Sequence, residues 1–285
     1  MSEHPLLKIA YQGEKGAYSD YAIDRLFGDK VVEKYPTRTS YDVIDAIKNG
    51  TVDFGLLPID NSIIGNITRT YDLLLEHRLF IVNEIIIPIH HAFLAVDQIS
   101  KDEIRKIYSH PAAISQCEVF LRAFNDAEII PTYDTAGSAK MIAEKKMYDT
   151  AAIASEKSAD LYNLKILQKN IEDFKHNQTR FVLVSINAGN EDPKNEILYK
   201  TSIVFSTPDK PGMLVRCLGI FEKYHINMSL LTSRPHKTEL WNYHFFVDID
   251  GHVRDENVSK AFDEIRRIAG SIHVMGSYTK FIGNE

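Results

Sequence analysis

Length, composition and charge place this chain among folded proteins and exclude several classes of function. With 285 residues the chain is longer than a single domain with one hydrophobic core usually is, which indicates two or three domains. Its 44% hydrophobic and 25% charged residues are typical of folded, not disordered, chains. The net charge of -6 argues against a basic surface for binding nucleic acid. It also means that an anionic ligand would have to be bound by local hydrogen-bond donors.

The first part of the chain alternates short apolar runs with helical patterns. The pattern predicts strands at 6–11, 31–35 and 54–59. It predicts helices at 19–27, 41–48 and 68–75. Ser19 and Ser40 are the expected N-caps of the first two helices. The alternation predicts a mainly parallel sheet that is covered on both faces.

A second set of the same kind begins near residue 85. Its predicted strands end at 109, 132, 154 and 186. Its predicted helices cover 112–124, 138–144 and 155–162. Two α/β lobes with a cleft between them are the natural packing of these elements, and ligands of such sheets bind beyond the carboxyl ends of strands.

A polar segment that contains Gly and Pro, residues 188–194, is the predicted linker to a further domain. Beyond it we expect strand, helix, strand, strand, helix and strand. The predicted ranges are 201–205, 213–223, 229–233, 243–249, 256–268 and 274–281. This βαββαβ order is the ferredoxin-like arrangement.

Small polar residues gather in loops next to predicted strands, at 60–62, 109–111, 134–138 and 177–180. Any one of these loops is best interpreted as a helix cap or a turn. Four of them in one α/β half favour a shared site, since hydroxyls, amides and helix N-terminal N–H groups bind anions. The residues alone therefore predict a two-lobed α/β protein that binds a small anion.

Five segments in chain order resemble the prephenate dehydratase family. They are residues 11–22, 53–75, 109–117, 151–164 and 177–181, the last with the Thr-Arg-Phe signature. The resemblance implies a carbon–oxygen lyase that converts prephenate to phenylpyruvate, with loss of CO2 and a hydroxyl, in phenylalanine biosynthesis. It also implies a two-lobed catalytic part like type II periplasmic binding proteins, without cofactor or metal.

The resemblance also implies which residues form the site. The expected catalytic residues are Thr179, Asn61 and Ser62, with the Thr179 hydroxyl as the donor to the departing oxygen. The expected substrate ligands are Ser109, Gln116, Thr135 and Arg180. Arg180 has a second interpretation as a structural ion pair, because neighbours along a strand point to opposite faces.

Residues 210–215 and 232–235 resemble the glycine loop and the Glu-Ser-Arg-Pro segment of the ACT domain that such enzymes carry. The resemblance implies a homodimer or tetramer through ACT domains, with L-phenylalanine as effector. Its expected ligands are Gly212, Met213, Leu214, Val215, Asn227 and Leu230. The expected domains are a catalytic one at 6–186 (lobes 6–85 with 175–186, and 86–174) and an ACT domain at 198–282.

Three positions depart from the family pattern: Ala17 replaces Thr, and Asp60 and Thr232 replace Glu. Two other functions stay open, an arogenate dehydratase and a non-catalytic protein that binds a small anion. The paired His90 and His91 lack a third ligand at metal-site spacing, so we expect a strand feature there.

The two cysteines lack metal-ligand or disulfide spacing, and no apolar run approaches the ~18 residues that a membrane helix needs. We expect a cytoplasmic protein without a secretory signal, and no partnership with a membrane or with nucleic acid. We also expect a monofunctional enzyme, because the α/β pattern begins at residue 6 with no helical chorismate mutase segment before it.

Overall fold

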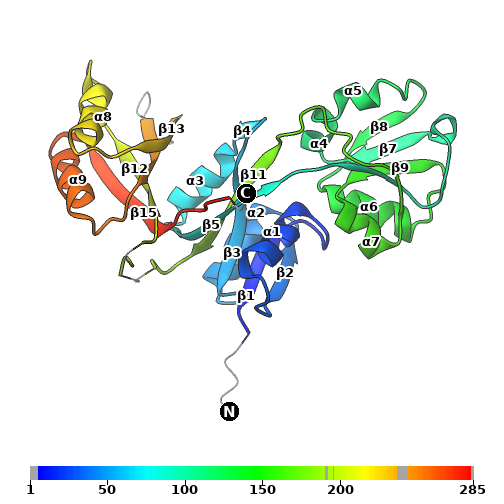
Figure 1. Ribbon diagram of the computed structural model, residues 1–285, viewed down its shortest axis with the longest axis horizontal. Helices are drawn as coiled ribbons and strands as arrows, with labels where there is room; N and C mark the ends of the chain where they lie inside the picture. The colour runs from blue at the N-terminus through cyan, green and yellow to red at the C-terminus, as the bar shows by residue number, and fades with distance from the viewer. Residues whose placement is uncertain (1–5, 190–191, 195, 236–242, 284–285) are drawn as a thin grey trace, which may run out of the picture. The chain divides into compact units, whose positions relative to one another are not determined.

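The protein is described by a computed structural model that covers residues 6–189, 192–194, 196–235 and 243–283 (Figure 1). The chain forms two compact units. The first runs to Ile67 and resumes over Ile85–Phe181, while the second combines Thr68–Glu84 with the chain from Val182 onward.

The first sheet has the strand order β2-β1-β3-β11-β5, with β4 paired to β3. Its strands are β1 (Lys8–Gln12), β2 (Glu33–Thr37), β3 (Phe54–Asn61), β4 (Gly65–Asn66), β5 (Phe80–Pro88) and β11 (Gln178–Ser185). β1 is parallel to β2 and β3, whereas β4 is antiparallel to β3. The predicted α/β lobe is confirmed, and its sheet is mixed.

Helices α1 (Tyr18–Phe27) and α2 (Ser40–Lys48) belong to this lobe, but neither predicted cap is correct. Thr39 caps α2, in a reciprocal capping box with Asp42, and Ser40 is already helical. Ala17 precedes α1 and makes no side-chain cap. The carboxylate of Asp20 accepts a hydrogen bond from Gly16 N instead, at 2.9 Å.

The second sheet has the order β10-β6-β9-β7-β8. Its strands are β6 (Ala92–Ala95), β7 (Lys106–Ser109), β8 (Glu128–Pro131), β9 (Thr150–Ala154) and β10 (Lys165–Gln168). β7 is parallel to β8 and β9, while β6 is antiparallel to β9 and β10, so this sheet is also mixed. The expectation of a mainly parallel sheet concerned the first lobe, where β1 is parallel to both of its neighbours, and it did not include the antiparallel β4.

The helices of this lobe are α4 (Pro111–Ser115), α5 (Glu118–Leu121), α6 (Thr135–Glu144) and α7 (Glu156–Tyr162). The single helix predicted at 112–124 is in fact α4 and α5. The helix breaks at Gln116, whose carbonyl accepts a hydrogen bond at 2.7 Å from the backbone N–H of Asp173. A hydrogen bond from a distant loop thus takes the place of the next helical hydrogen bond to the Gln116 carbonyl.

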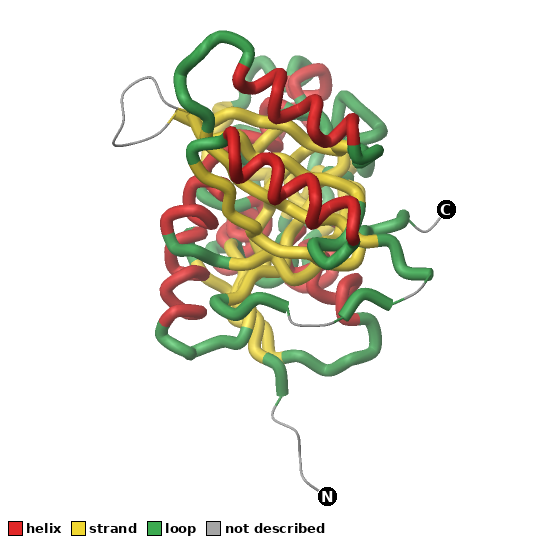
Figure 2. The backbone as a smooth tube through the Cα atoms, turned by 90° about the vertical axis from the view of Figure 1, so that its left-hand side faces the viewer, coloured by secondary structure: helices red, strands yellow, loops and turns green. Residues whose placement is uncertain are grey.

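The C-terminal sheet is antiparallel, with the order β13-β14-β12-β15, and it confirms the predicted βαββαβ domain. The elements are β12 (Tyr199–Ser206), α8 (Met213–Lys223), β13 (Met228–Pro235), β14 (Tyr243–Asp250), α9 (Glu256–Ile268) and β15 (Ser271–Thr279). Figure 2 shows α8 and α9 side by side over one face of this sheet. Buried Phe205, Phe221 and Phe262 join the helices to the sheet.

Two elements from the middle of the sequence pack in this second unit, α3 (Thr68–Glu76) and the first half of β5. The Tyr71 ring lies edge-on to Phe246, with centroids 5.1 Å apart. Glu84, fully buried, forms an ion pair with Lys200 at 2.8 Å. α3 is therefore fixed to the C-terminal domain, although the sequence places it in the catalytic part.

At Gly276 the backbone of β15 lies close to the backbone of β5. A Cβ added there would lie 2.0 Å from the carbonyl oxygen of Ile81, which is backbone and cannot rotate away. We expect Gly276→Ala to lower the free energy of unfolding by about 2 kcal/mol or more. The matched control is Gly219→Ala in α8, where a Cβ meets nothing within 4 Å. We expect this variant to raise the free energy of unfolding by at most about 1 kcal/mol. Equal unfolding midpoints in urea for both variants would contradict the close approach.

Candidate active site

Asn61 joins the end of β3 to the start of β11. Its Oδ1 accepts hydrogen bonds from the backbone N–H groups of Ile63 and Ile64, both at 2.9 Å. That orientation makes Nδ2 the donor, and it reaches Thr179 Oγ1 at 2.9 Å and Asn177 Oδ1 at 2.8 Å. Because the Thr179 oxygen accepts from Asn61, the hydroxyl proton of Thr179 can be donated elsewhere.

Ser62 ties the same two segments together through its backbone and its side chain. Its N–H donates to the carbonyl of Gln178 at 2.9 Å, and its Oγ accepts from Gln178 N at 2.9 Å. Its hydroxyl proton goes to the carbonyl of His176 at 3.1 Å. In this structure Ser62 therefore holds the segment that carries Thr179 against the segment that carries Asn61.

Arg180 forms an ion pair with Asp60 at 3.1 Å. The other carboxylate oxygen of Asp60 accepts from Asn66 Nδ2 at 2.7 Å, which attaches β4 to the pair. Thr179 and Arg180 are neighbours on one strand, so their side chains point to opposite faces. The ion pair lies on the face of β11 away from the Thr179 hydroxyl.

The second lobe carries three further expected ligands, at the end of β7, after α4 and at the start of α6. Ser109, fully buried at the end of β7, donates to the carbonyl of Ile153 at 2.7 Å. Gln116 Oε1 lies 2.8 Å from His91 Nε2. Thr135 is buried in the first turn of α6. The hydrogen bonds thus bring Asn61, Ser62 and Thr179 together in one cluster and connect Gln116 to His91.

The glycine loop before α1 contacts the second lobe through Asp134, which sequence reasoning did not single out. Asp134 Oδ2 accepts from Glu14 N at 3.1 Å and from Gly137 N at 2.8 Å. Burial raises the pKa of this carboxyl. Gly13 adopts φ +112°, and a Cβ there would lie 3.1 Å from Asp134 Oδ1, so the close approach requires glycine. The sequence placed Asp134 in the polar loop at 134–138 but gave no signal for its contact with Glu14.

His110 is the N-cap of α4, where its Nδ1 accepts a hydrogen bond from Ala112 N at 3.2 Å. Burial lowers the pKa of its imidazole. Within the ranges that the structure describes, no group of three or more His, Cys, Asp or Glu side chains could hold a metal ion. Over the same residues, no helix has the length and apolarity to span a membrane.

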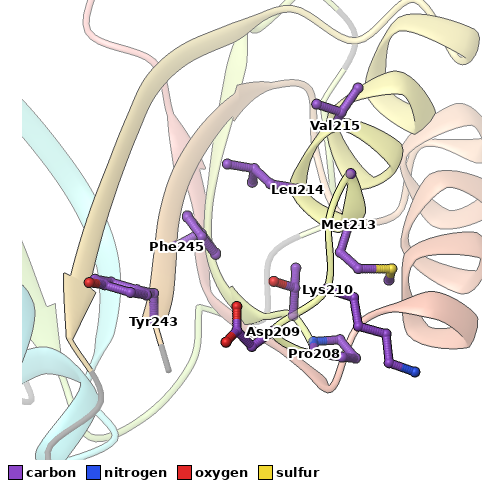
Figure 3. A pocket seen from close by; sticks show the side chains of 10 residues that line it. Pro208, Asp209, Lys210, Met213, Leu214, Val215, Tyr243 and Phe245 are labelled. Atoms are coloured by element: carbon purple, nitrogen blue, oxygen red, sulfur yellow. The ribbon is translucent and has the colours of Figure 1, made fainter. Parts of the chain in front are cut away.

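A cavity of about 210 Å³ lies between the loop before α8 and strand β14 (Figure 3). Its lining residues are Thr207, Pro208, Asp209, Lys210, Gly212, Met213, Leu214, Val215, Tyr243 and Phe245. Gly212 adopts φ +81° and is the N-cap of α8. The N–H of Met213 donates to the carbonyl of Lys210 at 3.3 Å, and the next two N–H groups, of Leu214 and Val215, have no acceptor within the helix. Four of the six expected effector ligands line this cavity.

The other two expected effector ligands lie elsewhere. Asn227 donates from Nδ2 to Asp250 Oδ2 at 2.9 Å. Leu230 lies in β13, opposite Asp248 of β14. Neither side chain lines the cavity.

Comparison with known proteins identifies two sequence families in the chain. Residues 9–188 match the prephenate dehydratase family, and residues 201–267 match the ACT domain. Arogenate dehydratase/prephenate dehydratase 2 of Arabidopsis thaliana, a chloroplastic protein, is 36% identical over 95% of this chain and 72% of its own length.

Solved structures extend the similarity to the whole described fold. The prephenate dehydratase of Arthrobacter aurescens in complex with L-Phe has a TM-score of 0.85 and 28% identity, over 96% of this chain and 90% of that one. GqqA, described as a novel type of quorum-quenching acylase, has a TM-score of 0.85 and 29% identity, over 96% of this chain and 98% of that one.

Asp20 connects the glycine loop to the acid stability of the protein. It accepts from Gly16 N at 2.9 Å and pairs with Lys34 at 2.7 Å and Lys157 at 3.1 Å. Burial alone would raise the pKa of this carboxyl, but hydrogen bonds from Lys34, Gly16 and Lys157 outweigh it and lower the pKa. A carboxyl with a lowered folded-state pKa stabilises the protein above its unfolded pKa, and this stability is lost as the pH falls through the folded value.

We therefore expect Asp20→Asn to lower the free energy of unfolding at pH 7 by about 1–3 kcal/mol. The difference from the parent should shrink below about pH 4, where the aspartate becomes protonated. Urea unfolding across this pH range measures both, with exposed Asp126→Asn as control. A difference that does not change with pH would show that the charge of Asp20 is not the stabilising feature.

Proposed function

The chain belongs to the prephenate dehydratase family, a family of carbon–oxygen lyases, and we propose that it aromatises prephenate to phenylpyruvate at the site around Asn61 and Thr179. The observation that carries this proposal is the directed set of hydrogen bonds through Asn61. It leaves Thr179 as a buried hydroxyl whose proton is available, in the segment that carries the Thr-Arg-Phe signature.

The chemistry follows from what prephenate must lose. The carbon–carbon bond to the ring carboxylate breaks and releases CO2, and its electron pair forms the new ring double bond as the C–O bond to the hydroxyl breaks. The departing oxygen needs a proton, which we assign to Thr179 as donor or relay. The Asn61 amide donates to the Thr179 oxygen and so disperses the charge that develops there.

The second lobe is proposed to hold the carboxylates of the substrate. Gln116 and the N-terminal turn of α6, with Thr135, offer neutral donors. Ser109 donates to a backbone carbonyl, so in this proposal it shapes the end of β7 and can only accept from the substrate. Arg180 acts through its pair with Asp60, which holds β3 and β4 behind Asn61.

The names of similar proteins suggest two other functions. The Arabidopsis relative carries both substrate names, and arogenate differs from prephenate in an amine where the other has a keto group. An acylase, as GqqA is described, would need a nucleophile beside a base, whereas the hydroxyl of Thr179 contacts the amide of Asn61, which is no base. Measuring product formation from prephenate and from arogenate with the purified protein distinguishes a prephenate dehydratase from an arogenate dehydratase.

Thr179→Val tests the assigned proton donor. It keeps the shape and the β propensity of the side chain and removes only the hydroxyl. We expect kcat to fall at least ~10²-fold with little change in KM, because the hydroxyl assists only the transition state. The control is Thr150→Val, a buried threonine at the start of β9. A folded Thr179→Val enzyme with the kcat of the parent would remove the assignment.

The ACT domain is proposed to bind L-phenylalanine in the cavity of Figure 3. The N–H groups beside Gly212 suit the carboxylate of the amino acid, and Met213, Leu214 and Phe245 suit its ring. Thr232 supplies no negative charge where the family has Glu, so we assign the ammonium group to Asp209, which lines the cavity. Pairing of ACT domains into a homodimer or tetramer belongs to this proposal.

Inhibition is proposed to pass through α3. Arg234 donates from Nε and Nη2 to the two carboxylate oxygens of Asp72, at 3.1 and 2.9 Å. Asp72 lies on α3, and the chain runs directly from the start of α3 at Thr68 back to β4 and Asn61. A ligand that shifts β13 would therefore shift the segment that leads to the catalytic amide.

We expect Arg234→Ala to bind phenylalanine in calorimetry as the parent does, while the inhibition reached at saturating phenylalanine falls about tenfold, the size of a typical allosteric coupling. Deleting residues 195–285 would be a poor test, since α3 and the first half of β5 belong to the same compact unit and would lose the residues they pack against. The double variant Asp72→Arg with Arg234→Asp restores the pair with reversed charges and should recover inhibition. Full inhibition of Arg234→Ala would exclude this route, and absence of phenylalanine binding to the parent at millimolar concentration would exclude the effector.

The expected catalytic domain at 6–186, with its two lobes, and the ACT domain at 198–282 are kept as the functional divisions. A cytoplasmic location is part of the proposal, because Cys117 and Cys217 are free and buried, as suits a reducing compartment.

A further inference from the structure

His91 lies between the two lobes of the catalytic part and contacts one proposed substrate ligand. Its Nε2 is 2.8 Å from Gln116 Oε1, and its Nδ1 is 2.8 Å from the hydroxyl of Tyr18 in α1. The rings of Tyr18 and His91 meet edge to face, with centroids 5.6 Å apart. His91 is 2% exposed, so these two partners decide where its protons lie.

The backbone around His91 is fixed by Glu172. One carboxylate oxygen of Glu172 accepts from His91 N at 2.9 Å, and the other lies 2.8 Å from His90 Nδ1. The Glu172 side chain is 2% exposed. The imidazole of His91 is therefore held in place, and its remaining freedom is the choice of which nitrogen carries a proton.

The hydroxyl of Tyr18 has one proton and two nearby acceptors. It lies 2.6 Å from the carbonyl of His90 and 2.8 Å from His91 Nδ1. If the proton goes to the carbonyl, Nδ1 must itself be protonated to donate to Tyr18. If the proton goes to Nδ1, that nitrogen is an acceptor.

Burial lowers the pKa of His91, which favours the neutral ring with a single N–H. A neutral ring protonated on Nδ1 leaves Nε2 as an acceptor, so Gln116 must turn its NH2 group toward His91. A neutral ring protonated on Nε2 donates to the Gln116 carbonyl and leaves the NH2 group free to point away. The position of one proton thus selects which end of the Gln116 amide is available to a ligand.

We propose that His91 is a positioning residue: with the anionic substrate bound, it carries its proton on Nε2 and thereby turns the NH2 group of Gln116 toward a substrate carboxylate. The inference rests on the proposed function, because it takes Gln116 as a substrate ligand. A carboxylate can only accept hydrogen bonds, so it selects the orientation of Gln116 that presents N–H groups. His91 itself touches no substrate atom in this proposal.

A double-mutant cycle tests whether His91 acts through Gln116. His91→Phe keeps a ring in the same space, and Gln116→Met keeps a side chain of similar length without hydrogen bonds. We expect His91→Phe to raise KM for prephenate at least about tenfold, the effect of one misdirected hydrogen bond to a charged group, with a smaller change in kcat. In the Gln116→Met background the same substitution should change KM less than about twofold.

Additive effects on KM would overturn the proposal and leave His91 as a packing residue. His225→Asn, at an exposed position with φ +54° that asparagine tolerates, is the control for histidine loss. Should His91→Phe not fold, His91→Gln serves in its place, because a glutamine NH2 group at this position can still donate to the Gln116 carbonyl and should retain part of the affinity.

Nitrogen-15 NMR of labelled imidazole tests the proton directly and does not depend on turnover. With phenylpyruvate as the bound probe, we expect the His91 signal to show a protonated Nε2, and the signal is assigned by its loss in His91→Phe. An unprotonated Nε2 in the complex would overturn the inference even if the enzyme is active. A parent protein that does not turn over prephenate would instead refute the proposed function, so the two failures are distinguishable.

Discussion

The candidate site depends on the carboxamide of Asn61, which joins the turn after β3 to the start of β11 through both ends of its amide. Two backbone N–H groups from the turn after β3 fix the oxygen of the amide, and its nitrogen then faces the start of β11. An aspartate of the same shape would present oxygen to Thr179 and to two further acceptors, at the cost of unpaired lone pairs in a buried place. The acceptor role of Thr179, and with it the available proton, follows from the amide.

The second structural constraint is the position of α3 and the start of β5 within the C-terminal unit. Glu84 and Lys200 are both buried, and removing either partner would leave an uncompensated charge in the interior. Arg234 and Tyr71 add a bidentate pair and an aromatic contact along α3. The segment between Asn61 and Glu84 thus begins at the proposed catalytic amide and ends buried in the C-terminal unit, so the covalent chain joins the proposed site to that unit directly.

The sequence predicts element type well and contacts between distant segments poorly. Periodicity was sufficient for the α/β lobes and for the βαββαβ domain, since each strand and helix has an apolar face of its own. The break at Gln116 was not predictable, because its cause is a hydrogen bond from residue 173. The caps at Ser19 and Ser40 were misplaced by one or two residues, since several neighbouring side chains can cap and only the backbone geometry selects one.

The candidate site shows the same division. The polar loops at strand ends predicted that Asn61, Ser62 and Thr179 lie together, because such ends meet at one edge of a sheet. What the loops could not predict is which proton each group holds. Tyr18 lies in the segment 11–22 and His91 in the histidine pair, but neither pattern indicates a contact with Gln116, which exists only once α1 of one lobe meets the other.

The three departures from the family pattern can be weighed by what surrounds each residue. Ala17 precedes α1 without capping it, and Asp20 supplies the missing acceptor for Gly16 N, so a threonine hydroxyl is dispensable there. Asp60 is one methylene shorter than glutamate, yet it reaches both Arg180 and Asn66, because β4 is folded back onto β3 beside it. Thr232 differs from these two. It lies in β13 opposite Phe246, and a neutral hydroxyl there cannot replace a carboxylate in binding an ammonium group. The departures at Ala17 and Asp60 are thus compensated by neighbouring residues, while the one at Thr232 removes a carboxylate, which is why the proposal assigns the ammonium group to Asp209 in the loop before α8.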